Sequence, residues 1–212
     1  MTSYVEIEKQ YRVITGDIFS YLKNFSFQKS KRILDQYFDT VEGHYYQEGI
    51  FIRIRNDRSL DIKFNPDHLG QSSPQERISC HEYSFEEPLD NPLYEKKWNE
   101  LTMLIKIEKP SGSSFEAFLT HNALKPMITL DKTRQTYQAG IFLVEVDEIK
   151  DVGTFLEVEY AGSPVSKEQI PSVLSTIDEL VKEMPIEPVA TGTFEAILRQ
   201  RNFELYKKGK YL

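Results

Sequence analysis

Carboxylate side chains recur at every second position in two segments that lie far apart in the chain. Glu6 and Glu8 belong to the segment 4–13, and Glu157 and Glu159 belong to the segment 155–160. Because successive side chains of a β-strand point to opposite faces, each pair shares one face. Like charges repel, so each pair lies either on a solvated outer face or around a divalent cation. Carboxylate oxygens on rigid strands suit Mg²⁺ or Mn²⁺.

Charged side chains repeat at the same spacing in further segments that have apolar residues on the opposite face. They are Arg53 and Arg55 in 50–55, Lys63 in 60–64, Lys132 and Arg134 in 127–137, and Glu145 and Asp147 in 142–149. In an antiparallel barrel with helices packed outside, the apolar faces contact the helices and the charged faces converge inside. Acids together with bases indicate a metal-chelated polyanion, and a triphosphate is the obvious one.

The elements that must position these residues follow from periodicity and turn signals. Further strands are predicted over 33–40 and 77–85, and helices over 17–25, 93–107, 114–124, 166–184 and 193–208. The fold class predicted from this order is α+β, with an antiparallel barrel and helices outside it.

Composition restricts the function classes. The chain has 212 residues, with Lys+Arg 26 against Asp+Glu 33 and a net charge of −7, which argues against general nucleic-acid binding. Cys80 is the only cysteine, so no intrachain disulfide can form, which fits a reducing compartment. No segment has the pattern of a signal peptide or an apolar run of about 20 residues, so we expect a cytoplasmic protein with no membrane partner.

The ordered set of motifs resembles the CYTH domain family, also called triphosphate tunnel metalloenzymes. Its hallmark is an E-x-E-x-K strand, which residues 6–10 match except at Gln10. The other matching motifs, in family order, are Tyr37-Phe38-Asp39-Thr40, the R-x-R of 53–55, Lys63, the K-x-R of 132–134 and the E-x-E of 157–159. The resemblance implies a single tunnel domain over residues 1–212, with an eight-stranded antiparallel β-barrel. It also implies Mg²⁺- or Mn²⁺-dependent chemistry on triphosphates.

The resemblance also implies roles for individual positions. The metal ligands would be Glu6, Glu8, Glu157 and Glu159, with Glu145 and Asp147 beside them. The phosphate clamps would be Arg53, Arg55, Lys63, Lys132 and Arg134. In the thiamine triphosphatase branch, the positions of Tyr37 and Lys63 resemble a pair that activates water. Lys63 could act as a base if the nearby arginines lower its pKa, or as a plain phosphate clamp. Glu82 either supports a clamp or is a solvated strand acid.

Gln10 departs from the family pattern. The strand pleat predicts that it shares the substrate-facing side with Glu6 and Glu8. A neutral amide can donate a hydrogen bond to a phosphate oxygen, but it adds no charge. The change therefore bears on activity or on substrate choice.

Three functions follow from the residues and the resemblance. The first is metal-dependent hydrolysis of inorganic tripolyphosphate, thiamine triphosphate or a nucleoside triphosphate. The second is a class IV adenylyl cyclase that forms cyclic AMP from ATP. The third is a non-catalytic polyphosphate- or nucleotide-binding module, which Gln10 favours. The expected partner is a small-molecule triphosphate, and the expected assembly is a monomer or a homodimer.

Overall fold

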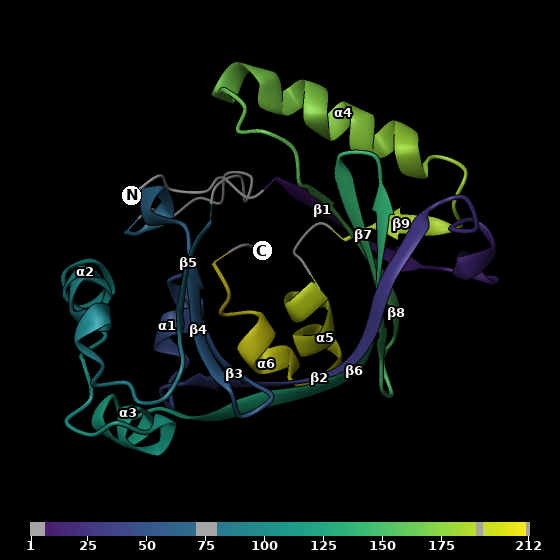
Figure 1. Cartoon of the computed structure of the whole chain (residues 1–212). Helices are drawn as coiled ribbons and strands as arrows, with labels where there is room; N and C mark the ends of the chain where they lie inside the picture. The colour runs from purple at the N-terminus through teal and green to yellow at the C-terminus, as the bar shows by residue number, and fades with distance from the viewer. Residues whose placement is uncertain (1–6, 71–79, 190–192, 211–212) are drawn as a thin grey trace. The chain divides into compact units, whose positions relative to one another are not determined.

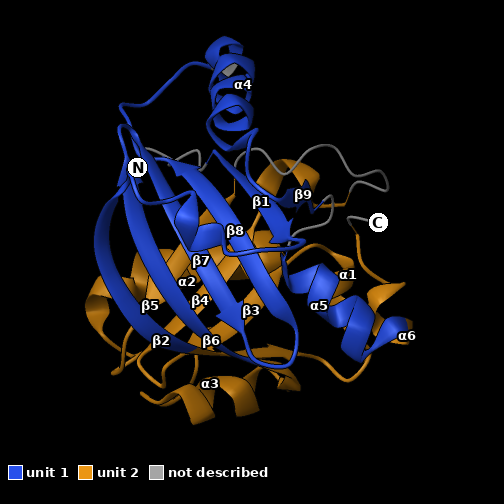
Figure 2. Ribbon diagram, turned by 90° about the vertical axis from the view of Figure 1, so that its right-hand side faces the viewer, with its two compact units in different colours: residues 1–33, 130–203 blue, residues 34–129, 204–212 orange. Residues whose placement is uncertain are grey.

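The computed structural model describes residues 7–70, 80–189 and 193–210 of the chain. The predictions for Glu6 and for the first part of the strand over 77–85 lie outside the described residues. The chain forms two compact units, coloured separately in Figure 2. Unit 1 contains residues 1–33 and 130–203, and unit 2 contains residues 34–129 and 204–212. A single tunnel domain over residues 1–212 stays a prediction.

A nine-stranded sheet runs through the chain in the order β5-β4-β3-β2-β6-β7-β8-β1-β9. The strands are β1 Glu8–Val13, β2 Ser26–Asp39, β3 Phe51–Arg55, β4 Ser59–Phe64, β5 His81–Phe85, β6 Lys125–Ala139, β7 Phe142–Ile149, β8 Gly153–Tyr160 and β9 Ile186–Pro188. The pairs β2–β3, β3–β4, β4–β5, β6–β7, β7–β8, β1–β8 and β1–β9 are antiparallel. The α+β class with an antiparallel sheet is therefore confirmed. In the described part of the chain β5 and β9 remain the edges of this order, so the closed eight-stranded barrel is not confirmed.

Six α-helices and four 3₁₀-helices accompany the described strands (Figure 1). The α-helices are α1 His44–Gln47, α2 Glu95–Ile105, α3 Phe115–His121, α4 Ile170–Val181, α5 Thr193–Arg201 and α6 Phe203–Tyr206. The 3₁₀-helices are η1 Ile18–Ser20, η2 Pro66–His68, η3 Pro92–Tyr94 and η4 Lys167–Gln169. Within residues 7–70, 80–189 and 193–210, no helix is long and apolar enough to cross a membrane.

The α-helix predicted over 17–25 is wrong, because only η1 is helical there. The backbone N–H groups of Tyr21 and Leu22 donate to the carbonyls three residues earlier, which is the 3₁₀ pattern. The Asp17 side chain accepts from the Phe19 N–H at 3.1 Å and caps this short turn. The segment is held by the burial of Ile18 and Leu22 rather than by helix propagation.

The long helix predicted over 193–208 is also wrong as one element, since α5 and α6 are separate. The helix predicted over 166–184 shortens to η4 and α4, and a proline in the first turn of α4 fits a helix start. The sequence interpretation missed α1 and β9, which have only four and three residues. By contrast, β7 spans the predicted range 142–149 without change.

The core of unit 1 lies between the apolar face of its strands and α4. Val144 and Val146 of β7 and Val158 of β8 are fully buried, and they cluster with Ile177 and Val181 of α4. Figure 1 shows α4 running along this side of β1 and β7. The alternation of β7 and β8 therefore leaves Glu145, Asp147, Glu157 and Glu159 on the face away from α4.

The core of unit 2 uses the same principle. Ile52 and Ile54 of β3 and Ile62 of β4 are buried with Trp98 of α2 and Phe118 of α3. The Trp98 indole N–H donates to the Leu89 carbonyl at 3.0 Å, so the largest core side chain has no unsatisfied donor. The arginines of β3 are consequently held on the face away from α2 and α3.

A tight turn after β3 fixes the register of the basic residues in unit 2. Asn56 and Asp57 have positive φ values of 53° and 52°. The Asn56 side chain accepts from the Leu34 N–H at 2.8 Å, and its own N–H donates to the Leu34 carbonyl at 2.8 Å. Asn56 thus ties the β3–β4 hairpin to β2.

We expect Asn56→Ala to lower the free energy of unfolding by about 1–2 kcal/mol, from the lost hydrogen bond and the left-handed backbone. Asn56→Gly should cost less, because glycine loses the bond but tolerates the positive φ. Urea unfolding of both variants measures the two contributions. Equal costs for Ala and Gly would contradict the backbone contribution, and no cost in either variant would contradict the role of Asn56.

Candidate functional site

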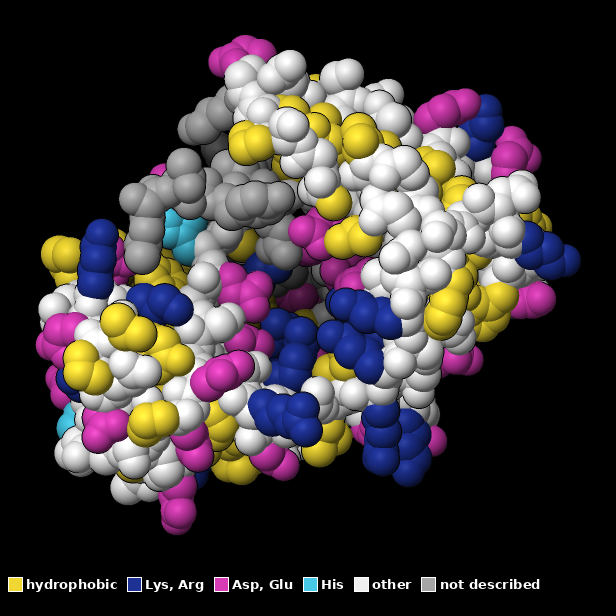
Figure 3. Space-filling model, viewed as in Figure 1, with side chains coloured by type: hydrophobic (Ala, Val, Ile, Leu, Met, Phe, Trp, Pro, Cys, Tyr) yellow, Lys and Arg dark blue, Asp and Glu magenta, His cyan; other side chains and the backbone are white. Residues whose placement is uncertain are grey.

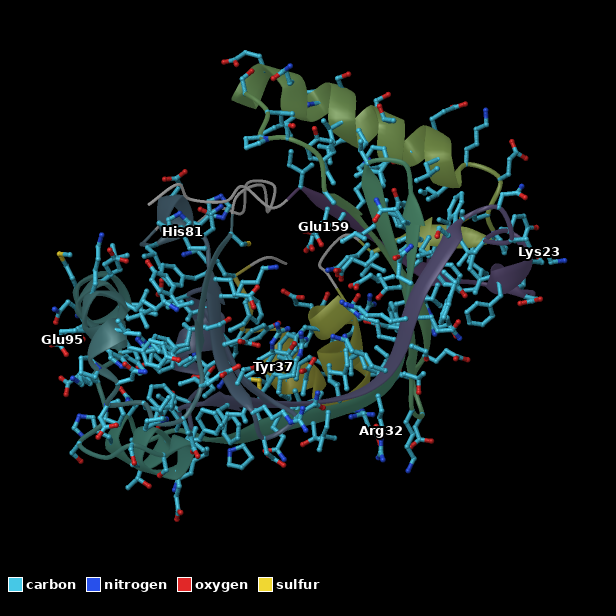
Figure 4. All side chains as sticks on the ribbon, in the orientation of Figure 1. Lys23, Arg32, Tyr37, His81, Glu95 and Glu159 are labelled. Carbon is cyan, nitrogen blue, oxygen red and sulfur yellow. The ribbon has the colours of Figure 1, made fainter. Side chains whose placement is uncertain are left out.

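Carboxylates of unit 1 face each other across neighbouring strands. Glu8 of β1 lies opposite Glu159 of β8, and Glu157 of β8 lies opposite Glu145 of β7. Figure 4 labels Glu159 on this part of the sheet. Like charges directly opposite each other destabilise a sheet. This face therefore needs positive charge, from the protein or from a bound cation.

Two basic residues of β6 supply part of that charge. The Lys132 Nζ is 2.7 Å from Asp147 Oδ2, and the Arg134 guanidinium donates to both Asp147 oxygens at 2.6 Å. Arg134 also pairs with Glu145, and its Nη2 is 3.7 Å from Glu157 Oε2. The predicted convergence of acids and bases is thus found within unit 1.

Asp147 is the most enclosed acid of this group. Its exposed fraction is 5% and that of Lys132 is 8%, so both charges depend on their partners. Burial alone would raise the pKa of Asp147. The hydrogen bond and charge of Arg134, together with Lys132, outweigh burial and lower that pKa.

Gln10 occupies the centre of the acidic face. Its Nε2 donates to Glu8 Oε1 at 3.2 Å and to Glu157 Oε2 at 3.3 Å. Its Oε1 accepts from the backbone N–H of Thr193 at 2.7 Å and from the Thr193 hydroxyl at 3.0 Å. The predicted placement of Gln10 on the same face as Glu8 is therefore confirmed.

The donors of this face suit a divalent cation in their chemistry. Glu8, Glu157 and Glu159 provide hard carboxylate oxygens at adjacent positions of two paired strands. Among the described residues, which exclude Glu6, no three His, Cys, Asp or Glu side chains converge closely enough to hold a metal ion. The metal ligands remain a proposal.

The basic residues of unit 2 also carry acidic partners. Arg55 makes a bidentate pair with Asp35, at 2.7 and 2.9 Å, and Asp35 is fully buried. Arg53 donates to Asp61 at 3.0 Å and to Glu82 at 3.3 Å. The contact between Arg53 and Glu82 therefore favours the alternative in which Glu82 supports a phosphate clamp.

Tyr37 and Lys63 lie on different strands of unit 2. Tyr37 of β2 is opposite Arg53, whereas Lys63 of β4 is opposite Phe51 and Glu82, so β3 runs between them. Figure 4 labels Tyr37. Burial raises the pKa of Tyr37, and the charge of Arg53 only partly offsets this effect. Tyr37 is therefore a protonated hydrogen-bond donor at neutral pH.

Asp39, the acid of the Tyr37-Phe38-Asp39-Thr40 motif, has a structural role. Its carboxylate accepts from the backbone N–H groups of Thr40, Tyr45 and Tyr46 at 2.6, 3.0 and 2.8 Å. It thereby holds α1 against the end of β2.

The sequence interpretation missed the contacts of Asp35 and Asp61 with the arginines, and it missed the burial of Glu195. Asp35 shares a face with Tyr37 and Asp61 shares one with Lys63, so alternation indicated their direction but not their arginine partners. Glu195 is only 1% exposed in the first turn of α5, and nothing in its sequence context predicted burial. Figure 3 shows both acidic and basic side chains among the residues that it colours on the viewed face.

The CYTH domain family matches residues 5–176 of the chain. No curated protein is significantly similar in sequence. One similar solved structure, of a protein from Pyrococcus horikoshii OT3, is 18% identical, with a TM-score of 0.61, and the match covers 93% of this chain and 99% of that one.

Two further solved structures are described as adenylyl cyclase candidates. The one from Hippeastrum is described as having a dominant triphosphatase activity. It is 21% identical, with a TM-score of 0.59 and coverage of 92% of this chain and 96% of that one. The one from Vibrio parahaemolyticus is 13% identical, with a TM-score of 0.58 and coverage of 92% and 99%. At such identities the likeness shows the fold alone. The family match spans well over half of the sequence, and this chain belongs to the CYTH domain family.

Proposed function

We propose that this protein is a metal-dependent triphosphatase that hydrolyses a small-molecule triphosphate. One observation carries the proposal: opposed carboxylates of β1, β7 and β8 lie beside Lys132 and Arg134 in one unit. Such a face binds an anion only together with cations, as a metal-chelated triphosphate would be bound. The activity described for the Hippeastrum relative supports hydrolysis over cyclisation.

The proposed metal ligands are Glu6, Glu8, Glu157 and Glu159, with Glu145 beside them. A bound Mg²⁺ or Mn²⁺ would neutralise phosphoryl oxygens and polarise the bond to be broken. The carboxylates themselves gain from the cation, because it removes the repulsion between Glu8 and Glu159 across the strand pair.

Lys132 and Arg134 are the proposed phosphate clamps of unit 1. Both already pair with Asp147, so a bound phosphate would share these donors with that acid rather than meet bare cations. We propose that Asp147 acts mainly as the internal counter-ion that keeps both bases in place. Its position beside the metal ligands is compatible with a lesser metal role.

Arg53, Arg55 and Lys63 are the proposed clamps of unit 2, and Tyr37 the residue that orients water. In hydrolysis, a water oxygen attacks the γ-phosphorus and the bond to the bridging oxygen breaks, giving phosphate and the diphosphate product. The proton leaves the attacking water. Arginine does not titrate, Tyr37 holds its own proton, and the carboxylates of the cluster already accept from the arginines. We therefore propose Lys63, in its neutral form, as the acceptor of this proton.

We also propose that the strands close into an eight-stranded antiparallel barrel, and the family match supports this proposal.

Two other functions compete. In a class IV adenylyl cyclase, the 3′-hydroxyl of ATP attacks the α-phosphorus and diphosphate leaves. The relative from Vibrio parahaemolyticus, which is described as an adenylate cyclase candidate, favours this alternative. A non-catalytic binding module would keep the charges and lose turnover, and the neutral amide of Gln10 is the observation that favours it.

The protein should release phosphate, and no cyclic AMP, from at least one of tripolyphosphate, thiamine triphosphate and ATP with Mg²⁺ or Mn²⁺. Glu159→Gln should lower this turnover by at least about 100-fold, because a catalytic metal supplies several kcal/mol. Glu148→Gln is the matched control, since Glu148 is exposed on the other face of β7. Cyclic AMP from ATP would favour the cyclase. Binding without turnover would favour the module, and full activity of Glu159→Gln would contradict the metal assignment.

The lowered pKa of Asp147 makes a prediction about acid stability. An acid whose pKa is lower in the folded state stabilises the fold above its unfolded pKa, about 4, and loses this effect as pH falls through the folded pKa. The free energy of unfolding of the natural protein should therefore fall below about pH 4, and Asp147→Asn should make that fall shallower. Urea titrations between pH 3 and 7 measure this, with the exposed Asp90→Asn as control. Parallel curves for all three proteins would refute the role of Asp147.

A further inference from the structure

The Gln10 side chain joins two parts of unit 1 that are 183 residues apart in sequence. On one side its amide nitrogen contacts Glu8 and Glu157 of the acidic face. On the other side its amide oxygen contacts the first residue of α5, Thr193, through both the backbone N–H and the hydroxyl. The main chain adds to this junction, since the Gln10 carbonyl accepts from the Val189 N–H at 2.9 Å.

The contacts explain why an amide stands at this position. The first turn of a helix has backbone N–H groups without intrahelical partners, and a side-chain oxygen can satisfy one of them. Gln10 supplies that oxygen to α5 from another strand. Only a side chain with both a donor and an acceptor can also donate to the carboxylates. Lysine has three donors and no acceptor, and glutamate has acceptors alone.

The helix held in this way is well packed. Phe194, Ile197 and Leu198 are buried, with exposed fractions of 9%, 0% and 1%, and the acidic Glu195 is buried among the same turns. Glu195 also lies at the end of the helix where the dipole favours negative charge. The hydrogen bonds from Thr193 to Gln10 therefore fix the start of a helix whose apolar side chains are already buried.

We propose that Gln10 is a positioning residue that couples the carboxylates of the acidic face to the docking of α5. A divalent cation bound at Glu8 and Glu157 would compete with the Gln10 NH₂ group for the same oxygens and would repel its donor end. Turning the amide round to offer its oxygen to the cation would point its NH₂ group at the Thr193 N–H, and the cap would be lost. Cation binding therefore loosens the start of α5, and docking of α5 weakens cation binding. The coupling rests on the proposed metal role of the carboxylates, whereas the cap itself does not.

This coupling distinguishes Gln10 from the lysine of the family motif. A lysine at this position could pair with Glu8 and Glu157, but it could not hold α5. Gln10, which departs from the family motif, would thus make the docking of α5 depend on the cation, rather than only remove one contact to phosphate.

Hydrogen exchange of residues 193–201, with Mn²⁺ binding measured by calorimetry on the same samples, tests the proposal. Without metal, Gln10→Lys should raise exchange at the start of α5 about fivefold, as expected for a lost helix cap. Gln10→Glu keeps the acceptor for Thr193 and should retain the protection. Gln28→Lys, the same substitution at an exposed position of unit 1, is the control and should change nothing.

With saturating Mn²⁺, the natural protein should exchange faster at α5, whereas Gln10→Lys should show no further change. Mn²⁺ binding without faster exchange would overturn the coupling and leave the proposed function standing. No Mn²⁺ binding at all would overturn both the coupling and the metal role. Unchanged exchange in metal-free Gln10→Lys would overturn the capping role itself.

Discussion

Carboxylates held directly opposite one another across paired strands are the constraint on which this structure depends. The register of β1 with β8 and of β7 with β8 places Glu8 against Glu159 and Glu145 against Glu157. Such a face is unfavourable by itself, so the chain must neutralise it. The bases of β6 do part of this, and their own enclosure requires Asp147 in turn. The result is a network of ion pairs in which each member has a partner of the opposite sign: Lys132, Arg134, Glu145, Asp147 and Glu157.

Unit 2 has basic residues on one face of a strand, and it neutralises them with buried acids. Its arginines lie on one face of β3, and buried acids, Asp35 and Asp61, accept their hydrogen bonds. Both units therefore keep their bases oriented before any ligand is present. An anion that binds such bases meets donors that are already ordered, which reduces the entropy lost on binding. The cost is competition, since the incoming anion must share each guanidinium with a resident carboxylate.

The period of two predicted which residues share a face, because alternation is a local property of a strand. It predicted β7 completely and the common face of Glu8 and Gln10 correctly. Contacts set by register between strands, such as Asp35 with Arg55, need the pairing itself and could not be predicted. The contact of Gln10 with Thr193 is still harder to predict from the sequence, since it joins a strand to a helix across most of the chain. The 3₁₀ turn at η1 shows the remaining difficulty: helical spacing of apolar residues does not distinguish a short turn from a helix.

The boundaries between the two units fall inside continuous elements rather than in linkers. β2 runs from 26 to 39 and changes unit after residue 33, and β6 runs from 125 to 139 and changes unit after residue 129. Neither unit can therefore be excised at a loop, because cuts at these borders would divide β2 and β6 in the middle of each strand. Protein engineers who look for points of insertion or circular permutation should therefore choose its hairpin turns instead.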